Sequence, residues 1–213
     1  MRHRRKGRKL GRHPSHQRAL LRNLASALIL TERDAELDNN APKVTGRIVT
    51  TLAKAKEVRP LVERCVTIAR RALVHQQAAD QLEPDADRHS NQWRTWRESD
   101  EYRQWNQAVA PVVAARRRAL TLLGSKQAVQ ILFSEIAPRF EDRPGGYTRV
   151  LRLAKPRLGD AGTQAILEFV GRNDRVRSKA SRPTFEIETE SPKAEVAAPS
   201  SDGTPLAAAE SGD

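Results

Sequence analysis

The sequence predicts an α+β fold in which several helices cover one face of a small, mostly antiparallel sheet of about three strands, with a basic N-terminal arm. Apolar residues recur at helical spacing through most of residues 15–136. Three short runs are rich in β-branched or alternating residues: Arg47–Thr51, Tyr147–Leu153 and Ala165–Val170. A chain of 213 residues suits one domain of ordinary size with appendages.

Residues 1–14 form the predicted basic arm. The first thirty residues carry nine Lys or Arg and no Asp or Glu. Residues 1–11 hold too few apolar side chains to build a core, and their like charges repel one another. We therefore expect an arm that is mobile alone and becomes ordered on nucleic acid, because released counterions favour binding. A merely solubilising tail and a mitochondrial transit peptide, which is also Arg-rich and free of acids, are the alternatives.

The globular domain is expected to span residues 15–177 and to begin with an amphipathic helix. Ser15 is a suitable N-cap, and Pro14 before it disfavours an earlier start. Leucines then repeat at helical spacing until the helix ends near residue 30. Arg18 and Arg22 lie four residues apart on another face, which gives the helix a basic stripe.

A polar loop, a strand and a long helix are predicted next. Residues 34–46 are rich in turn formers, and the strand Arg47–Thr51 follows them. Thr51 can cap a helix that runs to about residue 75, and Pro60 inside it marks either a kink or the start of a second helical piece. Cys65 is the only cysteine, and its apolar helical neighbours predict a small core residue.

Residues 76–111 hold all three tryptophans, and their acidic side chains outnumber their arginines. Trp93, Trp96, Tyr102 and Trp105 would share one broad face of an amphipathic helix. That face is either a platform on which RNA bases stack or a surface that packs on this protein or on a protein neighbour. We favour packing, because RNA repels a segment of net negative charge.

Two further helices and a hairpin complete the predicted domain. Val112–Leu123 is helical, with Gly124 as its C-terminal glycine, and Ser125 caps a helix over Lys126–Ile136 that ends at Pro138. The two later β-rich runs pair as an antiparallel hairpin through a basic turn at 155–162, and the earlier strand joins them.

The last segment, residues 178–213, is predicted to be disordered. Pro, Ser, Ala and Glu dominate it, so it cannot bury enough apolar surface to offset its chain entropy. Its net charge is −4 within a total of +12, which leaves +16 on the rest of the chain. A body of that charge is expected to bind phosphate.

Several kinds of chemistry lack a sequence signal. The chain contains no glycine-rich nucleotide loop, no cysteine pair for zinc and no nucleophile beside a base. Asp85, Asp87 and His89 only mimic a metal site, because their polar segment has no turn glycine. No stretch reaches the length of a membrane span, and the single cysteine fits a reducing cytosol. We expect a non-enzyme with no cofactor, metal, membrane or small-molecule substrate.

Basic side chains concentrate in three surfaces that are predicted to contact RNA. The first is the arm with the stripe of the first helix. The second is the start of the helix after Thr51, where the positive end of the helix dipole favours phosphate, although a solvated lysine pair is the plain alternative. The third is the Gly-Gly turn, which allows close backbone approach to a sugar-phosphate chain. The candidate RNA-contacting residues are Arg2, His3, Arg4, Arg5, Lys6, Arg8, Lys9, Arg12, His13, His16, Arg18, Arg22, Lys54, Lys56, Gly145, Gly146, Tyr147, Arg149 and Arg152.

These segments, in this order, resemble the bacterial large-subunit ribosomal protein seventeen family. The matching stretches are MRHRRKGRKLGRHPSHQRALLRNLASALI, TER, RIVTTLAKAKEVRPLVERCVTIAR and QAVQILFSEIAPRFEDRPGGYTRVLRLAKPRLGDAGTQAILEFV. The resemblance implies an α+β domain, without catalysis, that binds large-subunit ribosomal RNA near the outer end of the peptide exit tunnel. It also implies neighbouring large-subunit proteins as partners and a cytoplasmic location on the ribosome.

Three segments depart from the family pattern: residues 34–46, about 76–111 and 178–213. The resemblance implies nothing about their roles. Two functions from other classes stay open at this point, a free nucleoid- or mRNA-binding protein and an RNA-processing nuclease.

Overall fold

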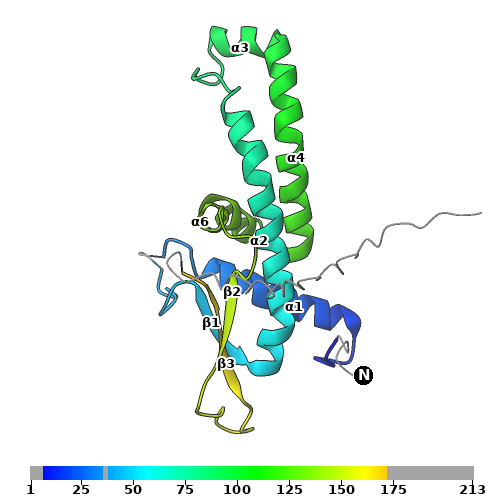
Figure 1. The fold of residues 1–213 in the computed structure, drawn as a ribbon, viewed down its shortest axis with the longest axis vertical. Helices are drawn as coiled ribbons and strands as arrows, with labels where there is room; N and C mark the ends of the chain where they lie inside the picture. Colours follow the sequence, from blue (N-terminus) through cyan, green and yellow to red (C-terminus); the bar gives the residue numbers. More distant parts are fainter. Residues whose placement is uncertain (1–6, 36–37, 172–213) are drawn as a thin grey trace, which may run out of the picture. The chain divides into compact units, whose positions relative to one another are not determined.

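The computed structural model describes residues 7–35 and 38–171. The predicted tail and the arm residues before Gly7 therefore lie outside the described residues. All described helices and strands fall within the unit Met1–Val176. Their order is α1, β1, α2, α3, α4, α5, a π-helical turn, α6, β2 and β3, which confirms the α+β class (Figure 1).

The sheet has three antiparallel strands in the order β1-β3-β2. They span Arg47–Thr51 (β1), Thr148–Arg152 (β2) and Gln164–Phe169 (β3), close to the predicted runs. Alternate residues of β3 are buried against the helices. On the opposite face Val49 and Leu151 both pair with Ile166, and these two side chains are 59% and 42% exposed. Helices thus cover only one face, as predicted.

The first helix, α1, spans Pro14–Leu30. Its N-cap is His13, so the prediction that Ser15 caps the helix was wrong. Pro14 occupies the first turn, where its missing N–H costs nothing and its fixed φ angle suits a helix. The proline therefore begins the helix instead of delaying it.

The second helix, α2, spans Leu52–Asp80 and is longer than predicted. Thr51 stands at the N-cap position, but its side chain makes no capping hydrogen bond. Pro60 lies inside the helix without dividing it. Val58 and Val62 on either side of the proline are fully buried, and this packing offsets the one backbone hydrogen bond that proline cannot make.

The aromatic segment forms two helices where one was predicted. These are α3, Asn91–Glu98, and α4, Asp100–Leu123. Ser99 between them has an extended backbone (φ −81°, ψ 166°), which turns the chain. Together with α2 they make a helical hairpin that extends away from the sheet, with α3 at its tip (Figure 1). Three of the four aromatic rings, those of Trp96, Tyr102 and Trp105, meet at this tip from both helices.

The rings at the tip pack on one another. Trp96 is 9% exposed and lies edge-on to Tyr102 and Trp105, with ring centroids 5.1 and 5.6 Å away. Tyr102 and Trp105 are stacked at 5.7 Å. The guanidinium group of Arg97 covers the ring of Trp93 at 4.8 Å. This arrangement agrees with a packing role, because the central ring has almost no surface left on which a base could stack.

The next turn has the predicted local chemistry. Gly124 adopts the left-handed conformation (φ 75°) and ends α4, and Ser125 accepts a hydrogen bond from the Ala128 N–H at 3.3 Å. The following helix is not one α-helix as predicted. It comprises α5 (Lys126–Ile131), a π-helical turn (Leu132–Ile136) and α6 (Ala137–Arg139). Pro138 has no N–H for the Ser134 carbonyl, which favours this change of hydrogen bonding.

One core joins the helices to the sheet. Its largest fully buried side chains include Phe140 and Tyr147 from the segment between α6 and β2, Leu28 from α1 and Leu167 from β3. Cys65 is also fully buried, as predicted, and burial raises the pKa of its thiol to about 12. Within the described part of the chain, no helix is both long enough and apolar enough to cross a membrane.

Candidate nucleic-acid interface

The N-terminal segment and α1 carry the exposed basic side chains of the first predicted surface. Arg8 is half exposed, and its guanidinium group lies 3.5 Å from the Glu57 carboxylate. The other described candidates of this surface are all exposed; they are Lys9, Arg12, His13, His16, Arg18 and Arg22. Arg2, His3, Arg4, Arg5 and Lys6 lie outside the described residues and stay predictions.

A local turn orients this segment before α1. Gly11 has a φ of +153°, and a Cβ atom there would lie 2.4 Å from the His16 ring. The Gln17 side-chain amide donates to the Gly11 carbonyl at 3.0 Å. Gly11 is therefore needed for this approach, and the turn fixes how the chain enters α1.

The first two predicted surfaces meet at the start of α2. The ion pair between Arg8 and Glu57 connects the arm to the second turn of this helix. Lys56 is exposed and Lys54 is half-buried in the same two turns. A hollow lined by Gly7, Arg8, Lys9 and Glu57 lies between the arm and the helix. Backbone N–H groups at a helix start favour phosphate, so the junction combines two sources of positive potential.

At the third surface, the assignment of Tyr147 requires a correction. Its side chain is 1% exposed, and its ring packs on Phe140 with centroids 5.2 Å apart. Tyr147 lies in the loop immediately before β2, next to the buried Thr148, so its burial does not follow the alternation of the strand. Tyr147 is therefore removed from the residues that can stack on RNA. Gly145 and Gly146 remain exposed, and Gly146 has a φ of +66°.

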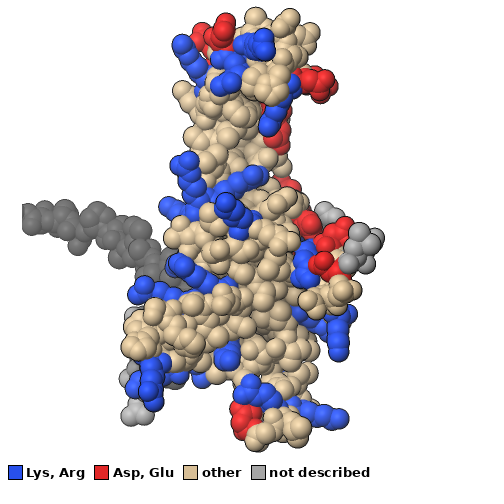
Figure 2. Space-filling view, turned by 180° about the vertical axis from the view of Figure 1, so that it is seen from behind, with Lys and Arg blue, Asp and Glu red and all other residues tan. Residues whose placement is uncertain are grey.

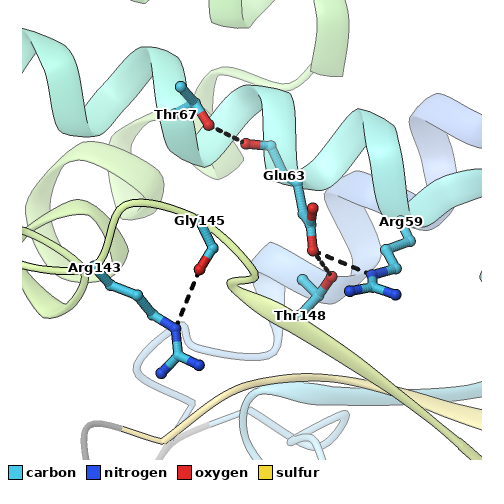
Figure 3. Close-up of polar contacts among 6 residues, drawn as sticks. All are labelled: Arg59, Glu63, Thr67, Arg143, Gly145 and Thr148. Carbon is cyan, nitrogen blue, oxygen red and sulfur yellow. Dashed lines mark hydrogen bonds and ion pairs between the residues drawn. The ribbon is translucent and has the colours of Figure 1, made fainter. Parts of the chain in front are cut away.

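A carboxylate on α2 fixes this turn, as Figure 3 shows. Glu63 accepts hydrogen bonds from the Thr148 hydroxyl at 2.9 Å and from Arg59 Nε at 3.1 Å. Arg143 Nε donates to the Gly145 carbonyl at 3.3 Å. These contacts bring Arg59 and Arg143 to the turn, and neither was among the residues predicted from the sequence. The i, i+4 spacing of Arg59 and Glu63 was the available signal.

The two arginines of β2 differ in their surroundings. Arg149 Nε lies 2.7 Å from a Glu168 carboxylate oxygen across the sheet, which offsets part of its charge. Its side chain is still 46% exposed. Arg152 is exposed at the end of the strand. Arg152 is thus the freer of the two for a phosphate.

The matching motif TER has a structural role. The Thr31 hydroxyl donates to the Leu28 carbonyl at 2.6 Å and accepts from the Gly46 N–H at 3.0 Å. Glu32 forms a two-pronged ion pair with Arg139, at 2.8 and 2.9 Å, which raises the Arg139 pKa. Gly46 (φ +72°) must lack a side chain, because a Cβ atom would lie 2.7 Å from this carboxylate. These contacts join α1 and α6 to the start of β1.

Basic groups are spread widely over the face shown in Figure 2, on the body and along the hairpin, whereas acidic groups gather in fewer places. Among residues 7–35 and 38–171, no group of three His, Cys, Asp or Glu side chains could hold a metal ion. Exposed arginines around ordered turns and a helix start define a basic α+β protein suited to binding a polyanion.

Comparison with known proteins identifies the family. Residues 20–170 match the family model described as ribosomal protein L17. A large ribosomal subunit protein bL17 from Rhodopirellula baltica is 60% identical over 98% of this chain and 95% of its own length. The bL17 proteins of Nitratidesulfovibrio vulgaris and Thermomicrobium roseum are each 38% identical, over 79% and 80% of this chain and 87% and 99% of their own lengths.

The chain belongs to the ribosomal protein L17 family. The resemblance found in the sequence is thereby confirmed. As a member of this family of bacterial ribosomal proteins, it is a structural protein of the cytoplasmic ribosome and not an enzyme.

Proposed function

We propose that the protein is a structural constituent of the large ribosomal subunit that binds ribosomal RNA by neutralising phosphates and matching the shape of the RNA. The relatives bear the name of large-subunit proteins. The observation that carries the proposal is the exposed basic surface that runs from Arg8 through Arg22 and meets the start of α2. Residues 8–22 contain no Asp or Glu, so most of this positive charge is not neutralised by nearby carboxylates. The excess positive charge favours a polyanion as the partner.

The proposed contacts combine ordered and adaptable parts. The candidate residues before Gly7 would order on RNA, whereas the turn at Gly11 and the helix α1 hold the following cations in place. Lys54, Lys56 and the Gly145–Gly146 backbone provide further backbone contacts, with Arg149 and Arg152 beside them. The place on the subunit near the exit tunnel, with neighbouring large-subunit proteins as partners, follows from the family resemblance.

Sedimentation of a cell lysate through a sucrose gradient tests this function. We expect the protein in the large-subunit fraction at one copy per particle, and we expect it to remain there after a high-salt wash. Protein that stays at the top of the gradient would contradict the proposal and would favour a free nucleic-acid-binding protein.

The remaining rival, an RNA-processing nuclease, has its own assay. Purified protein incubated with large-subunit RNA and Mg²⁺ should leave the RNA intact, because neither the sequence nor the family provides a catalytic group. Specific cleavage that disappears with a site variant would overturn this expectation.

A further inference from the structure

A groove runs between the two long helices of the hairpin, apart from the three surfaces described above. Its volume is about 300 Å³, and α2 and α4 supply its two walls. Arg71 and His75 line it from α2, and Arg118 lines it from α4; all three side chains are exposed. Small residues such as Ala72 and Ala115 lie along its floor, so the space between the helices is not filled.

The groove is basic and its cations lack acidic partners. No Asp or Glu belongs to its lining. Within residues 7–35 and 38–171, no ion pair engages Arg71 or Arg118. Arg116, which lies on another side of α4, differs because its guanidinium group covers the Phe133 ring at 5.3 Å. Two guanidinium groups from opposing helices thus remain for an external anion, and their planar forks suit phosphate.

The basic stripe of α1 leads to the C-terminal end of α4, one of the two helices that form the groove. Arg18, Arg22 and Ser26 follow one another at intervals of four residues and share a face of that helix. The Ser26 hydroxyl donates to the Leu123 carbonyl at 2.9 Å, at the C-terminal end of α4. The same helix face therefore joins the first basic surface to the end of α4, a little over one turn beyond Arg118.

We propose that this groove binds the sugar-phosphate backbone of an RNA strand that continues from the stripe of α1. A phosphate would lie between Arg71 and Arg118, with His75 as a further hydrogen-bond donor and a ribose over the alanine floor. The proposal rests on the proposed function and adds a fourth contact surface to it. The contact between the α1 face that carries the stripe and the end of α4 favours RNA over an acidic peptide as the occupant, because one strand can follow both basic surfaces.

The test compares two variants of the full-length chain that lose the same charge from the same hairpin. The groove variant carries Arg71→Gln and Arg118→Gln. The control carries Arg94→Gln and Arg103→Gln near the aromatic tip, where the ion pair of Arg103 among the described residues is with the largely exposed Asp100. Binding to protein-free large-subunit RNA is measured across a series of salt concentrations, and thermal unfolding verifies that both variants fold.

The groove variant should reduce the magnitude of the slope of log affinity against log salt by about 0.7 to 0.9, the amount expected for one lost phosphate contact. The control should keep the wild-type slope. Equal slopes for the groove variant and the wild type, or equal losses in both variants, would overturn the groove assignment. An intact slope with weaker binding to a ribosomal protein would point instead to an acidic peptide. Failure of the wild-type protein to bind this RNA would count against the proposed function itself.

Discussion

At the scale of single residues, Tyr147 has a buried hydroxyl beside the aromatic ring packing of the core. Its ring packs on Phe140, and its oxygen has no hydrogen-bond partner among the described residues. A buried polar group without a partner loses its hydration and gains nothing in return. The ring therefore stabilises the core, while the hydroxyl opposes that stabilisation.

Tyr147→Phe should raise the free energy of unfolding by about 1 kcal/mol, because it removes the unpaired hydroxyl. Tyr147→Ala should lower it by about 3 to 5 kcal/mol through loss of a core ring. Denaturant unfolding measures both values. RNA affinity should stay at the wild-type level in Tyr147→Phe, and weaker RNA binding by this stable variant would restore Tyr147 to the interface.

Asp160 illustrates how an exposed charge can be held in one place. Hydrogen bonds from the Arg157 side chain, and then from the Gly162 N–H, hold the pKa of its carboxyl well below the usual 3.8. Since the folded-state pKa is depressed, this ionised contact is complete above the ordinary pKa. It is lost only as the pH falls through the lower, folded value. The contact keeps the β2–β3 turn in its shape.

In an NMR titration, the chemical shift of the Asp160 carboxyl carbon should accordingly still be that of the ionised form at pH 3. Arg157→Gln removes the main cause and should return the pKa of this carboxyl towards 3.8. Lys155→Gln removes a charge from the same turn without removing this hydrogen bond, so it should leave the titration in place. An ordinary pKa in the wild-type protein would show that the pair does not persist in solution.

At the scale of elements, the hairpin tip depends on aromatic packing across a break in the chain. Trp93 and Trp96 come from α3, whereas Tyr102 and Trp105 come from α4. Ser99 separates the two helices, and the Ser90 hydroxyl accepts from the Trp93 N–H at 3.1 Å to begin α3. Because α3 is only eight residues long, its helix is too short to be stable alone. The rings therefore hold it against α4.

Trp96→Ala should weaken this local structure by about 3 kcal/mol, since its nearly buried ring contacts two others. Amide hydrogen exchange should speed up in α3 and in the first turns of α4, while the core helices keep their protection. Trp93→Ala is the control, with a smaller effect because that ring is more exposed. Unchanged exchange together with reduced RNA affinity would indicate a base-stacking platform.

The sequence predicted those structural elements that are determined by residues close together in the chain. Gly124 and Ser125 mark the turn after α4, and the β-rich runs mark the three strands. The break at Ser99 and the π-helical turn were not predicted, because the helical spacing of apolar and aromatic residues runs through both places. The ion pair of Glu32 with Arg139 joins residues 107 positions apart, and no local pattern reveals it.

The sequence predicts some parts of the candidate site and not others. The basic arm and the stripe of α1 are predicted from the sequence, because a dense run of basic residues can be recognised without knowledge of the tertiary structure. Tyr147 could not be placed, because it lies in the loop before β2, where no strand alternation tells whether a side chain is buried. Arg71 and Arg118 were missed for a related reason: only the pairing of α2 with α4 brings them to one groove.

At the scale of the whole molecule, the residues that form the core and the cations proposed to bind RNA are separate sets. Buried apolar side chains from α1, α2, the later helices and the sheet form one cluster. The candidate cations lie outside that cluster, on the segment before α1, on helix surfaces and on the sheet edge. Changes in these cations should therefore alter RNA binding with little effect on folding.

The arm provides the sharpest test of this separation. Replacing Arg2, Arg4, Arg5 and Arg8 with Gln should lower RNA affinity and reduce the slope of log affinity against log salt by about 3, because each lost phosphate contact removes about 0.7 to 0.9. The melting temperature should not change, since the only described ion pair among these residues is the half-exposed one of Arg8 with Glu57.

Adding the four changes one at a time distinguishes contact from general charge. Specific phosphate contacts predict a stepwise fall in slope, and Lys54→Gln with Lys56→Gln should add a separate fall of its own, because the start of α2 forms a second surface. An unchanged slope across the arm series, with the protein folded, would mean that the arm does not contact phosphate and that RNA binding depends on the remaining surfaces.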